Sequence, residues 1–455
     1  MVSARKRIWG WYFFDWASQP YNTLLLTFIF GPYFAKVAAA HYMGEGLAEE
    51  VAEAQAQALW GFGLTIAGIS IAILSPILGA IADGSGRRMA WIWVFSGFYV
   101  LGAAGLWTIT PDSPALVQAV VFFGIGFLGM EFATTFSNAL LPSLTADNRI
   151  GSVSGSGFAF GYVGGLVALI LMLLFFAENG DTGKTLVGLD PLFGLDPDQR
   201  EGTRFVGPFT AIWYAVFMIP FFLWVKEPKR DPGMILATRE ALRGLWRSIR
   251  GLVKRKSLAT YLGSSMFYRD ALNGLYGFGG VYAAGVLGWS VTQVGVFGIL
   301  GAVTAALASW LGGFADRRYG PKPVISWSIV VLIAVCIVVV GMSRETLFGV
   351  PLAEGSRLPD VVFYICGGLI GAAGGTVQAA SRTLMCRHTT PEQAAEAFGL
   401  FALSGKATSF IAPAMIASVS ALTDNQRIGI TPLIGLFLAG LILLVWVKPA
   451  GERAA

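Results

Sequence analysis

Charged residues are scarce in this sequence. Of its 455 residues, 13% are Asp, Glu, Lys or Arg, whereas these four make up about 25% of a typical soluble domain. Hydrophobic residues account for 55% of the chain. A folded surface with so little charge is poorly suited to water, so the composition excludes an ordinary soluble protein.

Cysteine and histidine are scarcer still. Cys336, Cys366 and Cys386 lie in or beside apolar runs without a CxxC spacing, and His41 and His388 are far apart in sequence. Neither a disulfide framework nor a zinc site is indicated. The apolar segments also lack HExxH and GxSxG motifs, so no nucleophile and base set for an enzyme is evident. We therefore expect no metal, no cofactor and no enzymatic activity.

Long apolar runs are what the sequence has instead. A helix needs about 20 such residues to cross a bilayer, and a β-barrel would show short alternating segments, which are missing here. We expect an all-α integral membrane protein with twelve transmembrane helices in two sets of six. The predicted spans are residues 10–35, 59–82, 89–109, 115–141, 153–177, 206–225, 257–287, 292–315, 323–342, 360–385, 395–420 and 428–447.

Basic residues are distributed unevenly about these spans. Of the 32 Lys and Arg residues, 22 fall on the side that holds the amino terminus, seven on the opposite side and three inside spans. Because cytoplasmic loops are enriched in Lys and Arg, we expect both termini to be cytoplasmic. The net charge of +5 then faces anionic lipid, so it indicates no nucleic-acid partner. On the opposite side, residues 38–58 are expected to form an acidic surface loop.

The polar stretch between the two sets divides the chain. We expect an N-terminal six-helix bundle at 1–225, a cytoplasmic linker at 226–256 and a C-terminal bundle at 257–455. The linker contains a basic amphipathic helix, with residues such as Leu245 and Trp246 on one face and arginines such as Arg243 on the other. It could lie on the inner membrane surface or remain a solvated connection, and the sequence leaves both open.

A glycine-rich motif with one aspartate occurs once in each half, after the second and the eighth span. The copies are GAIADGSGRR at 79–88 and GGFADRRYGPK at 312–322. Repetition at equivalent places favours a functional repeat over ordinary basic loops. The motif residues are Gly79, Asp83, Gly86, Arg87 and Arg88 in the first copy, and Gly312, Asp316, Arg317, Gly320 and Lys322 in the second. They resemble the loop signature of the major facilitator superfamily, which implies a charged gate that latches the cytoplasmic helix ends in one state.

Four further segments resemble one branch of that superfamily, the "unknown major facilitator" family, which includes a fungal vacuolar amino-acid effluxer of autophagy. They are WYFFDWASQPYNTLLLTFIFGPYF, SNALLPSLTADNRIGSVSGSGFAFGYVGG, FYRDALNG and GGTVQAASRTLMCRHTTPEQAAEAFGLFALSGKATSF. The chain departs from the family at Trp16-Ala17-Ser18-Gln19, where relatives usually show Trp-Ala-Asn-Ser. If that asparagine contacts substrate in relatives, the substrate differs here.

Six ionisable residues fall inside predicted spans: Asp15, Glu131, Arg269, Asp270, Arg382 and Lys406. Each costs roughly 2.5–3.5 kcal/mol at the bilayer centre unless it has a partner or a wet cavity. They handle substrate or protons, or they form structural ion pairs that fix helix register. We expect Glu131 to couple protons, Arg382 and Lys406 to attract a carboxylate or phosphate, and Asp15 to hold an amine, a pattern that suits a zwitterion.

Together these features predict a secondary active transporter. Its partners would be a small-molecule substrate, such as an amino acid, the lipid bilayer and, if transport is proton-coupled, protons. It would work by rocker-switch alternating access as a monomer in a bacterial inner membrane. A lipid, peptide or drug exporter of the same fold is the alternative, and a transporter-shaped receptor is a second one from another class.

Overall fold

A computed structural model describes residues 2–112, 114–180, 182–227 and 235–452. Lys229, Arg230 and Arg453 of the basic residues counted above, and residues 228–234 of the predicted linker, lie outside this part. The α-helices are α1 (Ala4–Pro20), α2 (Phe30–Gly44), α3 (Glu49–Ser85), α4 (Arg88–Gly105), α5 (Leu116–Leu140), α6 (Ile150–Phe175), α7 (Glu201–Arg204), α8 (Val206–Phe217), α9 (Ile219–Trp224), α10 (Thr238–Gly251), α11 (Lys256–Gly285), α12 (Val291–Tyr319), α13 (Pro321–Val340), α14 (Leu358–Arg387), α15 (Ala394–Lys406), α16 (Ile411–Thr423), α17 (Gln426–Gly429) and α18 (Thr431–Val445).

Short elements complete the described chain. One π-helix, η1 (Tyr21–Phe28), joins α1 to α2. The 3-10 helices are η2 (Leu106–Thr108), η3 (Leu141–Ser143), η4 (Asp147–Arg149), η5 (Leu192–Gly194) and η7 (Pro391–Gln393). Two strands, β1 (Thr346–Leu347) and β2 (Val350–Pro351), pair antiparallel in the connection between α13 and α14.

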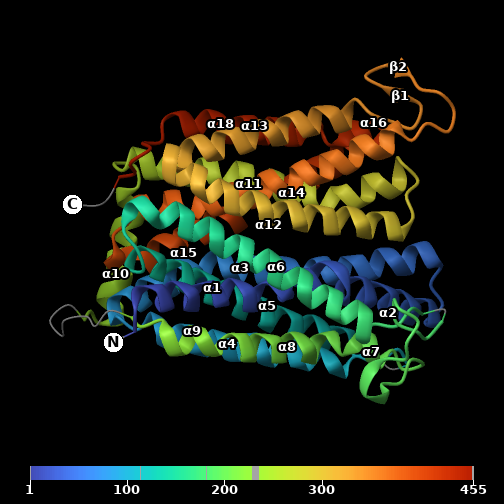
Figure 1. Ribbon diagram of the computed structural model, residues 1–455, viewed down its shortest axis with the longest axis horizontal. Helices are drawn as coiled ribbons and strands as arrows, with labels where there is room; N and C mark the ends of the chain where they lie inside the picture. The colour runs from blue at the N-terminus through green and yellow to red at the C-terminus, as the bar shows by residue number, and fades with distance from the viewer. Residues whose placement is uncertain (1, 113, 181, 228–234, 453–455) are drawn as a thin grey trace. The chain divides into compact units, whose positions relative to one another are not determined.

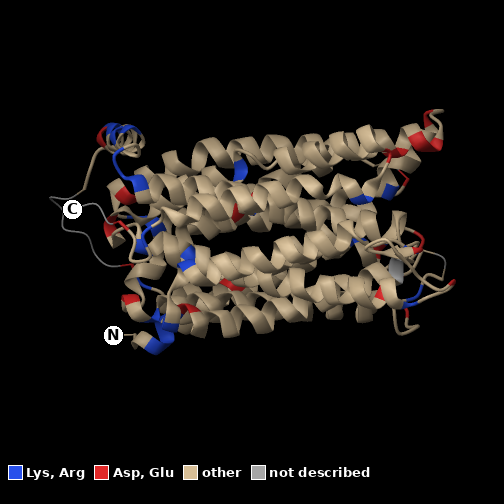
Figure 2. Ribbon diagram, turned by 90° about the horizontal axis from the view of Figure 1, so that it is seen from above, with Lys and Arg blue, Asp and Glu red and all other residues tan. Residues whose placement is uncertain are grey.

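Within the described ranges, eleven helical segments are long and apolar enough to cross a membrane. The remaining predicted span corresponds to α11, a 30-residue helix whose centre carries Arg269 and Asp270 and is therefore more polar. The charged residues otherwise gather at the helix ends, and few lie midway (Figure 2). This pattern is what bilayer insertion requires, because charge at mid-depth is expensive.

The prediction of a surface loop over residues 38–58 was wrong. Helix α2 continues to Gly44 and α3 already begins at Glu49, so most of this segment is helical. Alanines dominate the segment, and alanine has the strongest helix propensity. Glu49 and Glu50 lie in the first turn of α3, where negative charge complements the helix dipole. The acidic composition therefore favours a helix start.

The described residues form two compact units. Unit 1 comprises residues 1–71, 87–137 and 160–227, and unit 2 comprises 72–86, 138–159 and 228–455. In unit 1, α1 packs against α8 and α9, and α8 also packs against α4. Buried aromatic rings fill these contacts, among them Tyr99 and Tyr214, whose ring centroids lie 3.8 Å apart.

Unit 2 contains the second set of spans together with two segments from the first set, 72–86 and 138–159. Helix α14 packs against α12 and α13, and α18 packs against α11 and α13 (Figure 1). Glycine permits the closest approach: a Cβ on Gly371 of α14 would overlap the carbonyl oxygen of Gly301 in α12. Small residues let helix backbones meet closely in membranes.

The first span is interrupted by proline. Pro20 has no N–H, so the carbonyl of Trp16, four residues earlier, lacks its usual helical partner. The indole Nε1 of Trp213 donates to that carbonyl oxygen at 3.2 Å. The chain then continues as η1 before α2 begins. A donor from a neighbouring helix thus stabilises the interruption, as required where water is scarce.

The eleventh span is interrupted between α15 and α16, where residues 407–410 form turns. Pro413 lies in the first turn of α16, and its ring would clash with the carbonyl of Ser409 in a continuous helix. The span therefore consists of two half-helices, and some backbone groups at the end of α15 and the start of α16 lack partners inside their own helix. Polar partners for those groups must come from elsewhere.

Candidate functional site

Asp83, in the first copy of the motif, binds the start of α15. Its Oδ1 accepts a hydrogen bond from the amide of Ala395 at 3.2 Å, and its Oδ2 accepts one from Glu396 at 2.8 Å. The side chain is 6% exposed. First-turn amides have no partner inside their helix, and a carboxylate there also complements the helix dipole. Gly79 permits this approach, since a Cβ on it would overlap the Ala395 carbonyl.

Asp316, in the second copy, lies in the last turn of α12 and packs against the first turn of α6. A Cβ on Gly151 of α6 would lie 2.5 Å from the Asp316 carboxyl carbon. The side chain is 1% exposed, and neither carboxylate oxygen has a hydrogen-bond partner among the described residues. Each motif aspartate therefore meets the first turn of a helix from the opposite half of the chain.

The other motif residues shape the helix ends beside these aspartates. Gly86 and Gly320 have φ of +63° and +89°, a conformation that glycine adopts without strain. Gly312 contacts Thr376 of α14 closely. The Nζ of Lys322 donates to the carbonyls of Val445 and Val447 at 2.9 and 2.8 Å, so it caps the end of α18.

The arginines of the motif differ in exposure. Arg87, Arg317 and Arg318 are exposed, whereas Arg88 is buried. The backbone amides of Arg88 and Met89 donate to the two carboxylate oxygens of Glu227 at 3.0 and 3.1 Å. Glu227 therefore caps α4 in the same way that Asp83 caps α15. Sequence reasoning missed Glu227, which follows the sixth span and has no motif around it.

Arg382 is held by helices from the first half of the sequence. Its Nε donates to Ser154 Oγ at 2.9 Å, one terminal nitrogen donates to the Ser154 carbonyl at 2.7 Å, and the other donates to Asn138 Oδ1 at 3.1 Å. The guanidinium also lies 4.3 Å from the ring centroid of Phe158. It is 3% exposed. Arg382 thus joins α14 to the end of α5 and the first turns of α6.

Arg269 and Asp270 lie at the interruption between α15 and α16. Arg269 donates to the carbonyl of Phe401 in α15 at 2.7 Å, and its guanidinium lies 4.2 Å from the Phe401 ring centroid. Asp270 Oδ2 accepts a hydrogen bond from the amide of Ala412 in α16 at 3.1 Å. Two consecutive residues of α11 thus supply a donor to one half-helix and an acceptor to the other.

The remaining ionisable residues of the spans are half-buried. Lys406 is the last residue of α15, directly before the interruption. Asp15 lies in α1, where Gly161 of α6 approaches its backbone, and Glu131 lies in α5. Asp15 and Glu131 belong to unit 1, whereas Arg269, Asp270, Arg382 and Lys406 belong to unit 2.

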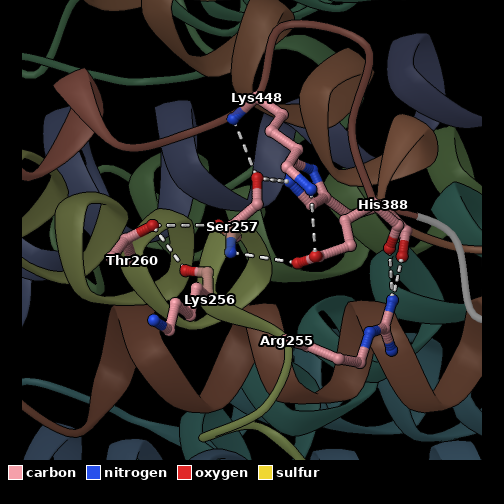
Figure 3. A network of polar contacts seen from close by, with 7 residues as sticks. Arg255, Lys256, Ser257, Thr260, His388 and Lys448 are labelled. Carbon is pink, nitrogen blue, oxygen red and sulfur yellow. Dashed lines mark hydrogen bonds and ion pairs between the residues drawn. The ribbon is translucent and has the colours of Figure 1, made fainter.

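A polar network ties the end of the described chain to the start of α11 (Figure 3). Glu452 Oε2 accepts from the amide of Ser257, and Arg255 donates to the backbone carbonyls of Glu452 and His388. The imidazole of His388 contacts Ser257 Oγ and the Leu384 carbonyl, each at 2.9 Å. Because a carbonyl only accepts, Nδ1 carries the proton and Nε2 accepts from Ser257. Burial lowers the pKa of His388, which favours this neutral form.

The fold agrees with that of known transporters. The human organic anion transporter MFSD10 matches with a TM-score of 0.68 and 17% identity, covering 98% of this chain and 100% of that one. The proton:xylose symporter XylE matches with a TM-score of 0.69 and 12% identity, covering 99% and 97%. The chain therefore has the twelve-helix fold of a major facilitator transporter, as predicted, and it is an integral, multi-pass membrane protein.

The particular family follows from sequence comparison. The family described as "Vacuole effluxer Atg22 like" matches residues 3–454, and the chain belongs to it. The uncharacterized MFS-type transporter YxiO of Bacillus subtilis is 26% identical over 448 residues, which cover 96% of this chain and 94% of YxiO. Autophagy-related protein 22 of Cryptococcus neoformans is 25% identical over 312 residues, 67% of this chain but only 50% of the fungal protein. The predicted family is confirmed, and the relatives are transporters, not enzymes.

Proposed function

We propose that this transporter moves an amino acid or a related zwitterion by rocker-switch alternating access. The observation that carries the proposal is the pair of contacts made by Asp83 and Arg382. Both join helices from the two halves of the sequence at buried positions, through hydrogen bonds to single charged groups. Such bonds break and re-form as a unit, so they suit a gate with two discrete states.

In this mechanism Asp83 and Arg382 hold one end of the helices closed. Opening that end requires the amides of Ala395 and Glu396 to leave Asp83, and Ser154 to leave Arg382. The sequence interpretation assigned Arg382 to substrate binding. Because Asn138 and Ser154 already receive hydrogen bonds from its nitrogens, we propose a role in the gate for this residue.

For the substrate, we propose that Lys406 attracts a carboxylate group and that Asp15 attracts an amine, since their charges suit these roles. Lys406 is half-buried at the end of α15, where the half-helix stops. Arg269 and Asp270 act as positioning residues, because they stabilise the two half-helix ends beside Lys406. The name of the family, a vacuole effluxer, supports a small solute as cargo.

We further propose that Glu131 couples transport to protons, as a half-buried carboxyl at mid-span in α5. The bacterial relative YxiO supports a place in a bacterial inner membrane. The basic residues support cytoplasmic termini, and a monomer suffices because alternating access needs only the two halves of one chain.

The test uses the purified protein in liposomes loaded with unlabelled amino acids. Counterflow of labelled amino acids should occur without a pH gradient, and a gradient should accelerate net flux. Glu131→Gln should abolish the effect of the gradient and leave counterflow intact, since exchange needs no net proton movement. No counterflow of any amino acid would refute the substrate class, and an unchanged gradient effect in Glu131→Gln would refute the coupling role.

A further inference from the structure

Helix α10 has three distinct faces along its 14 residues. Ala241 and Leu245 form a buried face. Leu242 and Trp246, the next residues around the helix, are exposed large apolar side chains. The third face is an exposed basic stripe made of Arg239, Arg243, Arg247 and Arg250. A helix in plain solvent would not need an exposed apolar strip between its buried face and its charges.

The buried face of α10 docks beside the Asp83 contact. A Cβ on Gly84 would lie 2.8 Å from the Ala241 Cβ, and the amide of Leu236, just before the helix, donates to the Gly84 carbonyl at 3.0 Å. Gly84 directly follows Asp83. Farther along α10, Ser248 lies near the carboxyl of Glu396, whose amide donates to Asp83. Helix α10 therefore contacts both partners of this gate.

The exposed side of α10 has an open pocket lined by both charged and apolar side chains. Arg239, Arg243 and Arg247 line it together with Leu242 and Trp246. The guanidinium of Arg250 lies 5.1 Å from the ring centroid of Trp246. Within α10 itself, Glu240 is the single acidic residue. A ligand for this surface needs negative charge for the arginines and an apolar part for Leu242 and Trp246.

We propose that this surface binds the anionic head groups of phospholipids in the adjoining leaflet, with Leu242 and Trp246 inserted at the acyl boundary. An anionic lipid offers both a phosphate and a hydrocarbon chain, which matches the basic stripe beside the apolar strip. Lipid bound there fixes the position of α10, and α10 in turn holds Gly84 and Glu396 together. The surface is thus a lipid-dependent brace on the Asp83 gate. Only this last effect rests on the proposed gating function.

Binding is tested with the full-length protein in detergent, titrated with phosphatidylglycerol or phosphatidylcholine, with bound lipid counted by native mass spectrometry. Phosphatidylglycerol should bind more tightly. Arg243→Gln combined with Arg247→Gln should weaken its binding about 30-fold, since each basic residue near an anionic surface contributes about 1 kcal/mol. The matched control combines Arg5→Gln with Lys6→Gln, which removes two exposed charges outside α10, and should leave the affinity unchanged.

Three results would overturn the lipid site. Equal affinity for the two lipids would make α10 a solvated linker. The same loss in the control would make the attraction a property of overall charge. Displacement of phosphatidylglycerol by an equal concentration of inorganic phosphate would make the surface a simple anion site.

The effect on the gate is tested by hydrogen exchange in nanodiscs, without any transport measurement. Phosphatidylglycerol should slow exchange of the Ala395 and Glu396 amides relative to phosphatidylcholine alone, and the Arg243→Gln, Arg247→Gln variant should lose this protection. If lipid binds and these amides exchange equally fast in both membranes, the brace is refuted while the lipid site stands. A failure of amino-acid transport would leave both readouts unaffected.

Discussion

The aspartates in the two copies of the repeated motif each approach the start of another helix, but they make different contacts there. Asp83 approaches the start of α15 and binds two of its amides. Asp316 approaches the start of α6 at Gly151 but binds none, and both its oxygens are buried without a hydrogen-bond partner among the described residues. Thr383 and Arg387 lie near this carboxyl, but burial is the larger influence on it, and burying a charge without close partners costs several kcal/mol. Equivalent sequence positions therefore need not make equivalent contacts.

Arg382 explains why the second contact holds without hydrogen bonds from Asp316. It binds Ser154, one turn beyond Gly151 in α6. Close backbone contact between Gly155 and Gly313 adds packing at the same place. One contact is thus maintained by an aspartate and the other by an arginine supported by glycines, so changes in the three charged residues should have unequal effects.

The largest effect is expected from Arg382→Gln. The change removes a buried guanidinium that donates to Ser154 and Asn138, and a hydrogen bond to a charged group contributes about 1.5–3 kcal/mol. We expect a loss of at least about 3 kcal/mol from this contact, seen as faster hydrogen exchange in the first turns of α6. The control is Arg387→Gln in the same helix, whose side chain donates to the Pro449 carbonyl at 2.9 Å and makes none of the hydrogen bonds to Ser154 and Asn138 described above. Equal exchange in the two variants would contradict the role given to Arg382.

Asp83→Asn should have the next largest effect. An amide side chain retains only one acceptor oxygen, so one of the Ala395 and Glu396 amides loses its partner and the charge facing the helix dipole disappears. We expect a cost of about 2–3 kcal/mol, measured as faster exchange of these amides and a changed transport rate. Glu392→Gln removes an exposed carboxylate just before α15 and serves as the control. Indistinguishable variants would show that general charge near α15 matters more than Asp83.

Asp316→Asn should act in the opposite direction. Its buried carboxylate has no hydrogen-bond partner among the described residues, and burial outweighs the attraction of the nearby Thr383 and Arg387. Neutralising it therefore removes a net desolvation cost and should stabilise the contact with α6 by about 1–2 kcal/mol. Thermal unfolding in detergent should shift upward, whereas Asp83→Asn should shift it downward. A destabilising Asp316→Asn would show that the charge has a partner in the state that dominates in solution.

The sequence predicted the membrane fold and the paired aspartates, because apolar runs and a repeated motif are patterns along the chain. It did not predict their partners. The amides bound by Asp83 lie about 310 residues later, and a backbone amide has no sequence signature. Asn138 and Ser154 were missed for a similar reason, since an uncharged polar residue in a helix does not by itself indicate a partner. Arg382 was assigned to substrate binding because the sequence shows that it lies inside a span but does not show its hydrogen-bond partners.

The interrupted eleventh span shows a signal that was present but not used. Residues 395–420 were predicted as one helix from their hydropathy. Pro413 accounts for the interruption, because in a continuous helix its ring would clash with the carbonyl of Ser409. Arg269 and Asp270 could then have been assigned to the two half-helix ends, which need a donor and an acceptor at this depth. A hydropathy average over a window of residues does not reveal a single proline that interrupts the helix.

The smallest effect concerns pH and tests the network around His388, whose imidazole is neutral, against the contacts made by charged residues. Burial holds the pKa of His388 below the ordinary value of 6.5, so the folded protein favours the neutral ring. The contribution of this network to stability is therefore complete above pH 6.5 and declines as the pH falls below that value, when unfolded chains bind the proton more readily. His388→Gln should flatten this part of the pH dependence of thermal unfolding, since glutamine does not titrate in this range. An unchanged slope in the variant would show that groups other than His388 set the pH dependence of unfolding.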